Sequence, residues 1–457
     1  MVTGFNPVEI DDFARFYGFH YDCCDSETLI RDFRIAMERG LRGQDSSLAM
    51  LPAYLSPKER PRAGKKAIAL DAGGTNLRAA RISFDGGGSP IIEDERKSPM
   101  PGTRGALSAA EFFSAVADFC LPLFDGGRIK GLGFCFSYPM EMKPDGDGVP
   151  LSFSKEVEVY GVTGQPIGRG LCEALAGRGI ETPPRVVLLN DTVAALLCGL
   201  SQIPPRIPSK FAVPGDIPAE NLSIPAGPAL GFILGTGLNI AYCEKNIPKI
   251  NFYSETDPQI VVCESGGFDF RYQGRLDMEF NAATKNPGAF SAEKASAGAY
   301  LGPFSLHVLK QAVRDGVLRF KKSRLLLEME SLTTRDLNEF LQAPATLPGA
   351  LGCLFDADEA GAVRSLSYIE SIVTERAAII AASQLAAVVE HCASAADPLA
   401  PVRIAVEGTT FSMYHFLGEA LKARFHSIMN SGSPRFCVIK AVEQASLFGA
   451  AAAALSV

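Results

Sequence analysis

Residues 66–80 read Lys-Ala-Ile-Ala-Leu-Asp-Ala-Gly-Gly-Thr-Asn-Leu-Arg-Ala-Ala, and this stretch decides the fold class. Lys66 to Leu70 make an apolar run of strand length, Asp71 to Arg78 contain adjacent glycines, and a second apolar stretch follows. The pattern predicts a strand, a glycine turn and a second strand. Because the glycines lie between two strands and do not open a helix, the stretch matches neither the Walker P-loop nor the dinucleotide-binding glycine pattern.

The turn within Asp71 to Arg78 has the composition of a phosphate cradle. Its glycines let backbone N–H groups approach anionic oxygens, Thr75 supplies a hydroxyl donor, and Asp71 supplies a carboxylate that can hold water around Mg²⁺. The same residues also suit a plain hairpin turn, so one motif of this kind leaves both interpretations open.

A strand followed by a turn of glycines and hydroxyls occurs twice more. Ala229 to Leu234 end at Gly235-Thr236-Gly237, and the strand resumes at Asn239 to Cys243. Arg403 to Val406 end at Glu407-Gly408-Thr409-Thr410. Three such turns favour nucleotide binding over unrelated hairpins. We find no repeat of fixed period, which excludes a solenoid, and we expect two α/β lobes that present their turns to a shared cleft.

Other segments show clear helix and strand patterns. Residues 26–41 read as a helix capped by Ser26, and Ser108 to Glu111 form a capping box that opens another helix. Gly131 to Ser137 and Arg185 to Leu189 read as buried strands, and residues 368–391 as one long helix.

Two segments invite special interpretations. Asp145-Gly-Asp-Gly148 with Glu156 has some features of a calcium loop, but Val149 and Pro150 stand where an oxygen ligand and a glycine belong. We therefore expect a turn between strands. The seven prolines between Ile203 and Pro228 are incompatible with regular structure and predict an exposed excursion.

Length and composition set the outer limits. The 457 residues correspond to about three domain-sized units or two large ones, at ~150 residues each. With 47% hydrophobic and 21% charged residues, a sizeable core is expected and wholesale disorder is excluded. The formal net charge of −7 does not favour a nucleic-acid partner.

The cysteines and the two chain ends bear on location. Eleven cysteines without a Cys-x-x-Cys pair, and only five histidines, speak against structural zinc and a disulfide framework and suit reduced, buried thiols. The segment MVTGFNPVEIDDF lacks the basic flank and apolar run of a secretory signal. The longest apolar tract noted, Ala445 to Val457, is too short to cross ~30 Å of hydrocarbon. We expect a cytoplasmic protein with no membrane partner.

Nine segments together point to a known family. They are Ser46–Pro52, Leu70–Ala80, Gly133–Pro139, Leu188–Leu196, Leu234–Tyr242, Glu264–Phe268, Asn286–Gly288, Glu293–Gly302 and Val406–Phe411. In this order, the set resembles the hexokinase family over nearly the whole chain, from about residue 26 to about 453. Each motif is weak alone, and nine in register are specific.

The resemblance implies a fold and an activity. The fold is the two-lobed actin-like, ribonuclease-H-like α/β fold, with an active-site cleft between a small domain (67–190 plus 443–457) and a large domain (1–66 plus 191–442). The activity is transfer of the γ-phosphate of ATP to the 6-hydroxyl of glucose or a related hexose. ATP is then a partner beside the hexose, and Mg²⁺ is expected, held mainly by the nucleotide and waters with no assigned protein ligand.

For the phosphoryl transfer itself, the resemblance implies a base and a positive charge. Asp191 matches the catalytic base, which takes the proton of the acceptor hydroxyl as its oxygen attacks the γ-phosphorus. Lys155 would offset the charge that builds on the transferred group. Both have ordinary alternatives, because Asp191 also stands where a helix N-cap is expected and Lys155 also suits an exposed strand position.

Sugar recognition requires side chains that bond two neighbouring hydroxyls at once. By resemblance, the hexose contacts are Ser137, Ser154, Lys155, Asn190, Asp191, Asn239, Glu264 and Glu293. Taken singly, glutamates such as Glu264 and Glu293 are more often solvated surface charges. Their role is therefore assigned by the family spacing around them.

The nucleotide contacts follow in the same way. By resemblance they are Asp71, Gly73, Gly74, Thr75, Asn76, Arg78, Thr236, Gly408, Thr409 and Ser446. The last three, Gly408, Thr409 and Ser446, are expected on the adenosine side.

Several positions depart from the family pattern. Val262 and Ser265 stand where an asparagine and a tryptophan are usual, and the chain contains no tryptophan. Glu407 replaces an aspartate and Phe448 replaces a lysine. The first two changes touch the wall beside Glu264, so they bear on which hexose is preferred.

Two other functions are compatible with parts of the pattern. An actin- or chaperone-like nucleotide switch would use the glycine turns but would not need Asn190, Asn239, Glu264 and Glu293 together. A sugar sensor that has lost turnover would keep the sugar contacts. The sequence determines neither the preferred hexose, the phosphoryl donor, product inhibition nor the oligomeric state.

Overall fold

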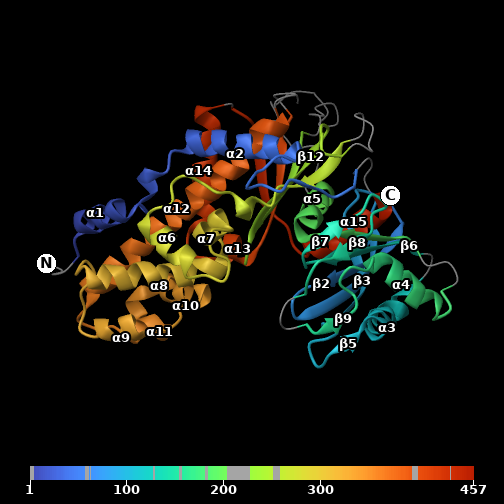
Figure 1. The fold of residues 1–457 in the computed structure, drawn as a ribbon, viewed down its shortest axis with the longest axis horizontal. Coiled ribbons are helices and arrows are strands. Elements are labelled where there is room, and N and C mark those ends of the chain that lie inside the picture. The colour runs from blue at the N-terminus through green and yellow to red at the C-terminus, as the bar shows by residue number, and fades with distance from the viewer. Residues whose placement is uncertain are drawn as a thin grey trace, which may run out of the picture.

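The computed structural model describes residues 5–56, 61, 63–126, 129–153, 157–180, 184–202, 227–250, 258–393, 400–432 and 434–456. Within these residues the chain forms two lobes that lie side by side (Figure 1). Two helices, α5 (Asp191–Gln202) and α15 (Ala445–Ser456), lie where the lobes meet.

A five-stranded sheet forms the centre of the small lobe, in the order β4-β3-β2-β6-β10. The pairs β2–β3 and β3–β4 are antiparallel, whereas β2, β6 and β10 run parallel. The strands are β2 (Lys66–Ala72), β3 (Asn76–Phe84), β4 (Pro90–Pro99), β6 (Ile129–Phe136) and β10 (Val186–Leu189). Along β2, Ile68 and Leu70 pack in the core under α3 and α4, and Ala67 and Ala69 pack in the core with α15. Helices therefore cover both faces of the sheet.

The sheet of the large lobe repeats this order in β13-β12-β11-β14-β15, with β1 added beyond β13. The pairs β11–β12 and β12–β13 are antiparallel, whereas β11, β14 and β15 run parallel. The strands are β1 (Leu51–Pro52), β11 (Ala229–Leu234), β12 (Leu238–Glu244), β13 (Gln259–Val262), β14 (Val402–Glu407) and β15 (Cys437–Ala441). The three glycine turns thus follow β2, β11 and β14, in line with the sequence prediction.

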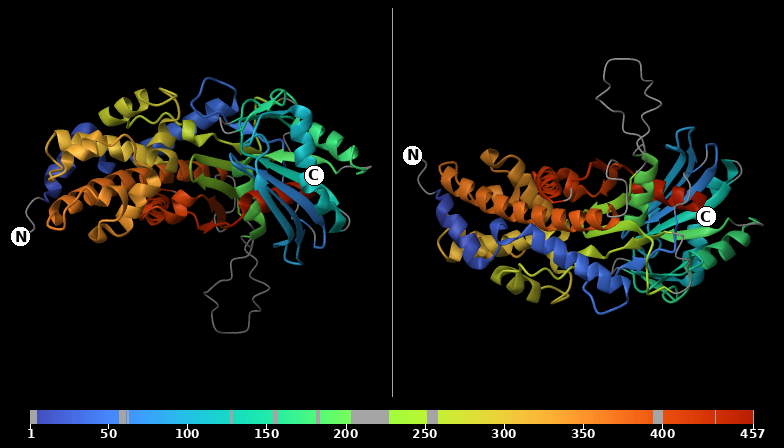
Figure 2. Two further views of the ribbon diagram at one scale, coloured as in Figure 1. Left: turned by 90° about the horizontal axis from the view of Figure 1, so that it is seen from below. Right: turned by 90° about the horizontal axis from the view of Figure 1, so that it is seen from above.

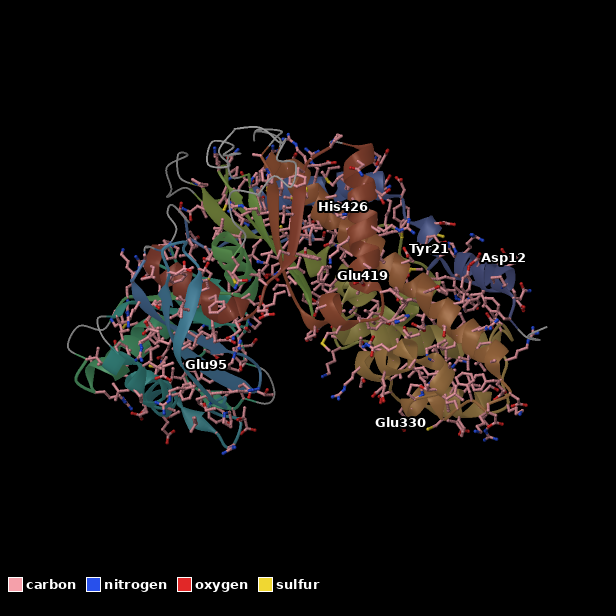
Figure 3. The ribbon with its side chains drawn as sticks, turned by 180° about the vertical axis from the view of Figure 1, so that it is seen from behind. Asp12, Tyr21, Glu95, Glu330, Glu419 and His426 are labelled. Atoms are coloured by element: carbon pink, nitrogen blue, oxygen red, sulfur yellow. The ribbon has the colours of Figure 1, made fainter. Side chains whose placement is uncertain are left out.

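Helices make up most of the rest of the large lobe, and α12 runs along it toward the small lobe (Figure 2). The remaining helices and short strands are α1 (Pro7–Tyr17), α2 (Ser26–Leu41), α3 (Ala109–Cys120), α4 (Ile167–Ala176), α6 (Arg275–Ala282), α7 (Ser291–Ser296), α8 (Gly298–Arg314), α9 (Ser323–Glu328), α10 (Thr334–Gln342), α11 (Gly349–Gly352), α12 (Ala360–Ala393), α13 (Thr409–Met413), α14 (Leu417–Ser431), β5 (Leu107–Ser108), β7 (Met140–Met142), β8 (Gly148–Pro150) and β9 (Val159–Tyr160). Charged side chains such as Asp12, Glu330 and Glu419 are exposed on this lobe, and Glu95 is exposed on β4 (Figure 3).

Local predictions from the sequence agree with these elements. The helix at 26–41 is α2, but its N-cap is Asp25, whose carboxylate accepts the Thr28 N–H, and not the predicted Ser26. The predicted capping box closes on Ser108 and Glu111 at the start of α3. The segment after Asp145 is a turn between β7 and β8, and the Asp147 carboxylate accepts the N–H of Gly168 at 2.6 Å. It serves the start of α4 and not a calcium loop. Of the proline-rich segment, residues 203–226 lie outside the described residues.

Two further expectations need correction. All eleven cysteines are free thiols, but only five of them are buried; Cys23, Cys172, Cys243, Cys392 and Cys437 are partly exposed, and Cys353 is exposed. The tract at 445–457 is also not the longest apolar helix, because Ala360–Cys392 is long and apolar enough to cross a membrane by length and composition. Of its most apolar window, 94% is buried inside the protein, which is the pattern of a core helix.

Candidate active site

Asp191 is the first residue of α5, and Asn190 alone separates it from the end of β10. Its Oδ1 accepts the Thr192 N–H at 2.7 Å and the Thr192 hydroxyl at 3.2 Å. The side chain that caps α5 is Asn190, whose Oδ1 accepts the Val193 N–H at 2.9 Å. The capping alternative thus applies to Asn190, while Oδ2 of Asp191 has no hydrogen-bond partner within the described ranges. That oxygen is available to accept a proton.

Three carboxylates from different elements influence one another in the cleft. Burial raises the pKa of Asp191, and the charge of Asp71 on β2 adds to this, while the hydrogen bonds from Thr192 oppose it. Burial, together with the charges of Asp191 and Asp71, raises the pKa of Glu407 to about 7, and Arg78 opposes this shift. The ends of β2, β14 and α5 therefore face a common space. Glu407 was not assigned to the site from the sequence.

The first glycine turn is fastened by a polar network. Arg78 donates to Oδ2 of Asp71 from Nη2 at 2.6 Å and from Nε at 3.0 Å. Ser446 of α15 donates its hydroxyl to the same oxygen at 3.1 Å and accepts from Arg78 at 3.0 Å. Ser446 was expected on the adenosine side, but the structure places it against Asp71, beside the first turn.

The turn itself presents open backbone. Gly74, Thr75 and Asn76 are exposed, and a Cβ added at Gly74 would meet no atom within 4 Å. Packing therefore does not require glycine at position 74. An anion that approaches the backbone would require it, as the phosphate interpretation predicts.

The second and third glycine turns touch each other. The carbonyl oxygen of Gly235 accepts the Gly298 N–H and the Thr410 hydroxyl, both at 2.8 Å. Gly408 has φ +133°, and a Cβ there would lie 2.2 Å from the Leu234 oxygen, so glycine is required. The two turns form one rigid unit at the end of β11 and β14.

A cavity of about 440 Å³ opens beside this unit. Its lining comes from the second and third turns and from α8, α10 and α13. The lining residues are Thr236, Gly298, Ala299, Thr334, Arg335, Asn338, Thr409, Thr410, Met413 and Tyr414. Thr236 and Thr409 were assigned to the nucleotide from the sequence. The α10 residues were missed because they follow no glycine turn.

The proposed sugar contacts on the large lobe form a second group. Asn239 donates from Nδ2 to Oε1 of Glu264 at 2.9 Å and accepts the Ser265 N–H at 3.2 Å. Oε2 of Glu293 accepts the Leu238 N–H at 3.2 Å. Burial raises the pKa of both glutamates, and the charge of Asp191 also raises that of Glu264. The structure thus brings Asn239, Glu264 and Asp191 into one region.

Two glycines make room for the Glu293 carboxylate. A Cβ at Gly237 or at Gly266 would lie 2.8 or 2.9 Å from Oε2 of Glu293. Of the remaining predicted contacts, Ser137 is exposed at the end of β6, and its N–H donates to the Ala72 oxygen at 3.1 Å. Residues 154–156, and with them Ser154 and Lys155, lie outside the described residues.

The Hexokinase family profiles match residues 16–200 and 229–456. The chain belongs to the hexokinase family. It is 28% identical to hexokinase-3 of Mus musculus over 85% of this chain and 41% of that protein. It is 25% identical to the hexokinase of Schistosoma mansoni over 96% of this chain and 95% of that protein. The chain therefore spans about two fifths of the length of the mouse hexokinase-3 and nearly all of the Schistosoma mansoni hexokinase.

Solved structures show the same hexokinase fold. The hexokinase from Schistosoma mansoni complexed with glucose matches with a TM-score of 0.72 at 23% identity, covering 99% of this chain and 100% of that one. A second hexokinase crystal structure matches with a TM-score of 0.72 at 21% identity. The two-lobed actin-like architecture expected from the sequence is confirmed.

Ser265 and Val262, two positions that depart from the usual hexokinase residues, are both buried. Ser265 is fully buried, and its hydroxyl has no hydrogen-bond partner in the described part of the chain. Val262 is buried at the end of β13. Within the described residues, no group of three His, Cys, Asp or Glu side chains is arranged to hold a metal ion.

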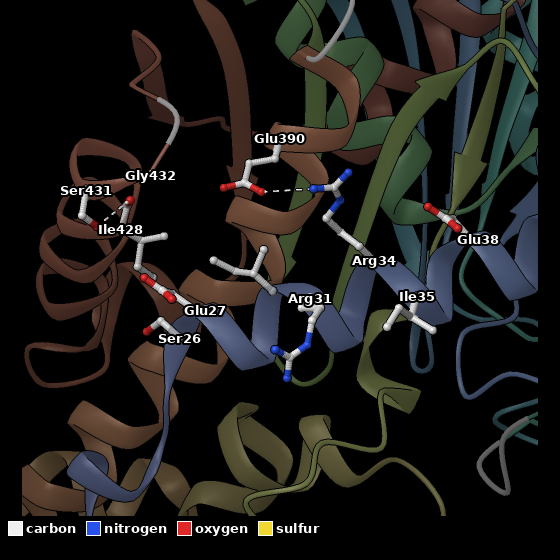
Figure 4. Close-up of a pocket in the computed structure, with 11 residues that line it drawn as sticks. Ser26, Glu27, Arg31, Arg34, Ile35, Glu38, Glu390, Ile428, Ser431 and Gly432 are labelled. Carbon is white, nitrogen blue, oxygen red and sulfur yellow. Dashed lines mark hydrogen bonds and ion pairs between the residues drawn. The ribbon is translucent and has the colours of Figure 1, made fainter.

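A further cavity lies apart from the site, between α2, α12 and α14 (Figure 4). It measures about 440 Å³, and Arg34 and Glu390 form an ion pair at 3.6 Å in its wall. Arg31, Glu27 and Glu38 add charges of both signs. No candidate site residue lines it.

Proposed function

We propose that this chain is an ATP-dependent hexokinase, which transfers the γ-phosphate of ATP to the 6-hydroxyl of glucose or a related hexose. The observation that carries the proposal is the position of Asp191. Its free carboxylate oxygen lies in a region shared with Asp71 of the first glycine turn and with Glu264 of the sugar group. The related hexokinase from Schistosoma mansoni is complexed with glucose in its solved structure, which supports glucose as a candidate.

In this mechanism Asp191 removes the proton of the 6-hydroxyl as its oxygen attacks phosphorus. A carboxylate that is partly desolvated and close to Asp71 is a stronger base than an exposed aspartate, since both effects raise its pKa. The Thr192 hydrogen bonds fix the carboxylate through Oδ1, which leaves Oδ2 for the substrate. Asn239, Glu264 and Glu293 would bind neighbouring sugar hydroxyls and set the orientation of the 6-hydroxyl.

ATP would enter with its phosphates at the open backbone of Gly73 and Gly74 and its adenosine in the cavity beside Thr236 and Thr409. Mg²⁺ would neutralise phosphate charge, and the carboxylates of Asp71 and Glu407 suit the waters of such an ion. Lys155 remains our candidate for the charge on the transferred group. The eleven free cysteines suit a reducing compartment, and on that basis we propose a cytoplasmic location.

The test is ATP consumption with a panel of hexoses, comparing the parent with Asp191→Asn. The variant keeps the size of the side chain, so sugar binding should survive while the rate falls on the order of 10²-fold or more. Asp12→Asn on the exposed face of α1 is the matched control and should keep the parent rate. Equal rates for Asp191→Asn and parent would remove the proposed role, and a sugar-independent ATPase would favour the nucleotide-switch alternative.

A further inference from the structure

Glu370 is a fully buried carboxyl group on α12, outside the set of residues assigned to the reaction. Its Oε2 accepts the hydroxyl of Ser305 on α8 at 2.6 Å. Oε1 has no hydrogen-bond partner among the residues that the structure describes. Burial raises the pKa of Glu370 to about 8, and the Ser305 hydrogen bond only partly opposes this. At pH 7 the side chain is therefore mainly neutral.

Tyr414 connects Glu370 to the cavity assigned to the nucleotide. The tyrosine follows α13, is 4% exposed and lines that cavity. The side chain of Thr374, one turn after Glu370 on α12, acts on its phenol group as a hydrogen-bond partner. Burial raises the pKa of Tyr414 well above its ordinary value, a charge on Glu370 raises it further, and the Thr374 hydrogen bond lowers it. Glu370 and Tyr414 therefore lie close enough to respond to each other.

Helix α8 connects Glu370 to the second glycine turn. At its start, Gly298 donates its N–H to the Gly235 oxygen at 2.8 Å, and Ala299 donates to the Thr236 oxygen at 3.0 Å. Pro303 lies between this end and Ser305 and has no N–H, so the helix lacks one of its own hydrogen bonds there. The Ser305–Glu370 contact thus anchors a weakened first part of α8, the part that holds the second turn.

We propose that Glu370 is a positioning residue for the nucleotide: its carboxyl group anchors α8 through Ser305 and stays buried while it is neutral, and its ionisation loosens the cavity wall. This inference rests on the proposed ATP-dependent function. A charge on Glu370 would act on the phenol of Tyr414, which follows α13, and the hydrogen-bond partner that α8 supplies is the neutral Ser305. On α12 itself, the buried Arg376 is committed to Asp277 at 2.7 Å. An unpaired buried charge is relieved by local opening that admits water.

The experiment measures the Kd of ATP with Mg²⁺ by calorimetry, without sugar, from pH 7 to 9.5. If only the neutral form holds the wall in place, the Kd of the parent rises on the order of 10-fold at one unit above the pKa of Glu370. Glu370→Gln keeps an acceptor for Ser305 but cannot ionise, so its Kd should stay flat. Glu375→Gln is the matched control on the same helix, at a partly exposed ion pair with Arg424, and should keep the rise.

Ser305→Ala gives a second, independent test. Because the Ser305 hydrogen bond lowers the pKa of Glu370, its loss should move the midpoint of the rise to higher pH. A flat Kd in the parent, a rise that persists in Glu370→Gln, or an unmoved midpoint in Ser305→Ala would overturn the proposal. A purely structural role would instead weaken binding equally at every pH. The readout is binding, so it remains decisive even if no hexose is phosphorylated, which would refute the proposed function alone.

Discussion

The residues at the centre of the cleft carry less negative charge than their number implies. The charge of Asp71 adds to the rise that burial causes in the pKa of Asp191, and burial together with the charges of Asp191 and Asp71 raises the pKa of Glu407 to about 7. Glu407 is then roughly half protonated at neutral pH. Arg78 opposes part of this crowding and is itself bound by Asp71. A triphosphate can enter such a cleft at lower electrostatic cost than three full carboxylate charges would allow.

The Thr192 hydrogen bond allows a test of the base. Asp191 must be ionised to accept a proton, so kcat/KM for the hexose should fall as pH drops through its folded-state pKa, which burial raises above 3.8. The Thr192 hydroxyl lowers that pKa. Thr192→Val removes one hydrogen bond of about 1 kcal/mol, so the acid limb should move up by about 0.7 pH units.

The measurement is the pH profile of kcat/KM with ATP saturating. Thr346→Val, at an exposed position of the large lobe, is the control and should leave the limb in place. If the acid limb of kcat/KM is unchanged or moves to lower pH in Thr192→Val, a group other than Asp191 sets it.

Single residues were predictable where chemistry follows a local pattern. Gly408 sits in a turn that demands positive φ, whereas the local pattern at Asp191 predicted a helix N-cap that the structure gives to Asn190 instead. Arg335 and Asn338 on α10 carry no such pattern, since only tertiary packing brings them to the cavity. From the sequence, Glu407 stood out only because it replaces the aspartate that is usual in the family. Its raised pKa could not be predicted, because it depends on burial and on the charges of Asp191 and Asp71 from other elements.

At the scale of elements, α5 and α15 occupy equivalent places on two sheets of the same strand order. Helix α5 packs on β11 and β14, α15 packs on β2 and β6, and the two helices pack on each other. A Cβ at Gly449 of α15 would lie 2.1 Å from the Ala194 oxygen of α5. Close backbone approach between the lobes therefore depends on glycine.

We expect Gly449→Ala to lower stability. Overpacking costs about 1–3 kcal/mol, and the better helix propensity of alanine offsets up to about 1 kcal/mol of this. The net loss in the free energy of unfolding, measured by urea denaturation, should be about 1–2 kcal/mol. Gly86→Ala is the control, because a Cβ there meets nothing within 4 Å and the backbone is not left-handed. A Gly449→Ala protein as stable as this control would contradict the close contact.

The elements themselves were largely predictable, and their assembly was not. Apolar periodicity gave α2, the capping box gave the start of α3, and apolar runs gave the strands before each glycine turn. The pairing of Leu230 with Ile404, between strands far apart in sequence, leaves no local trace. The shared strand order of the two sheets could therefore not be predicted from the sequence, because the two sheets repeat a topology without repeating a sequence pattern.

On the scale of the whole molecule, the lobes meet through one buried apolar cluster. It includes Ala69 of the small sheet, Val262 of the large sheet, Val193 of α5 and Leu447 of α15. The phosphate contacts that we propose in the first turn belong to the small lobe, while the proposed sugar contacts Asn239, Glu264 and Glu293 belong to the large lobe. Catalysis would require the lobes to approach, and sugar contacts are the means by which binding could drive that movement.

We expect saturating hexose to reduce the radius of gyration measured by small-angle scattering, because closure around the sugar excludes water, which would otherwise accept the phosphoryl group. ATP with Mg²⁺ alone should produce less compaction, since it lacks the sugar contacts. Glu264→Gln combined with Glu293→Gln should abolish the response to hexose while leaving the free protein unchanged. A parent whose radius does not change with its preferred sugar would exclude sugar-driven closure. Water would then reach ATP as readily without sugar as with it, and the ATPase rate without sugar should approach the rate with it.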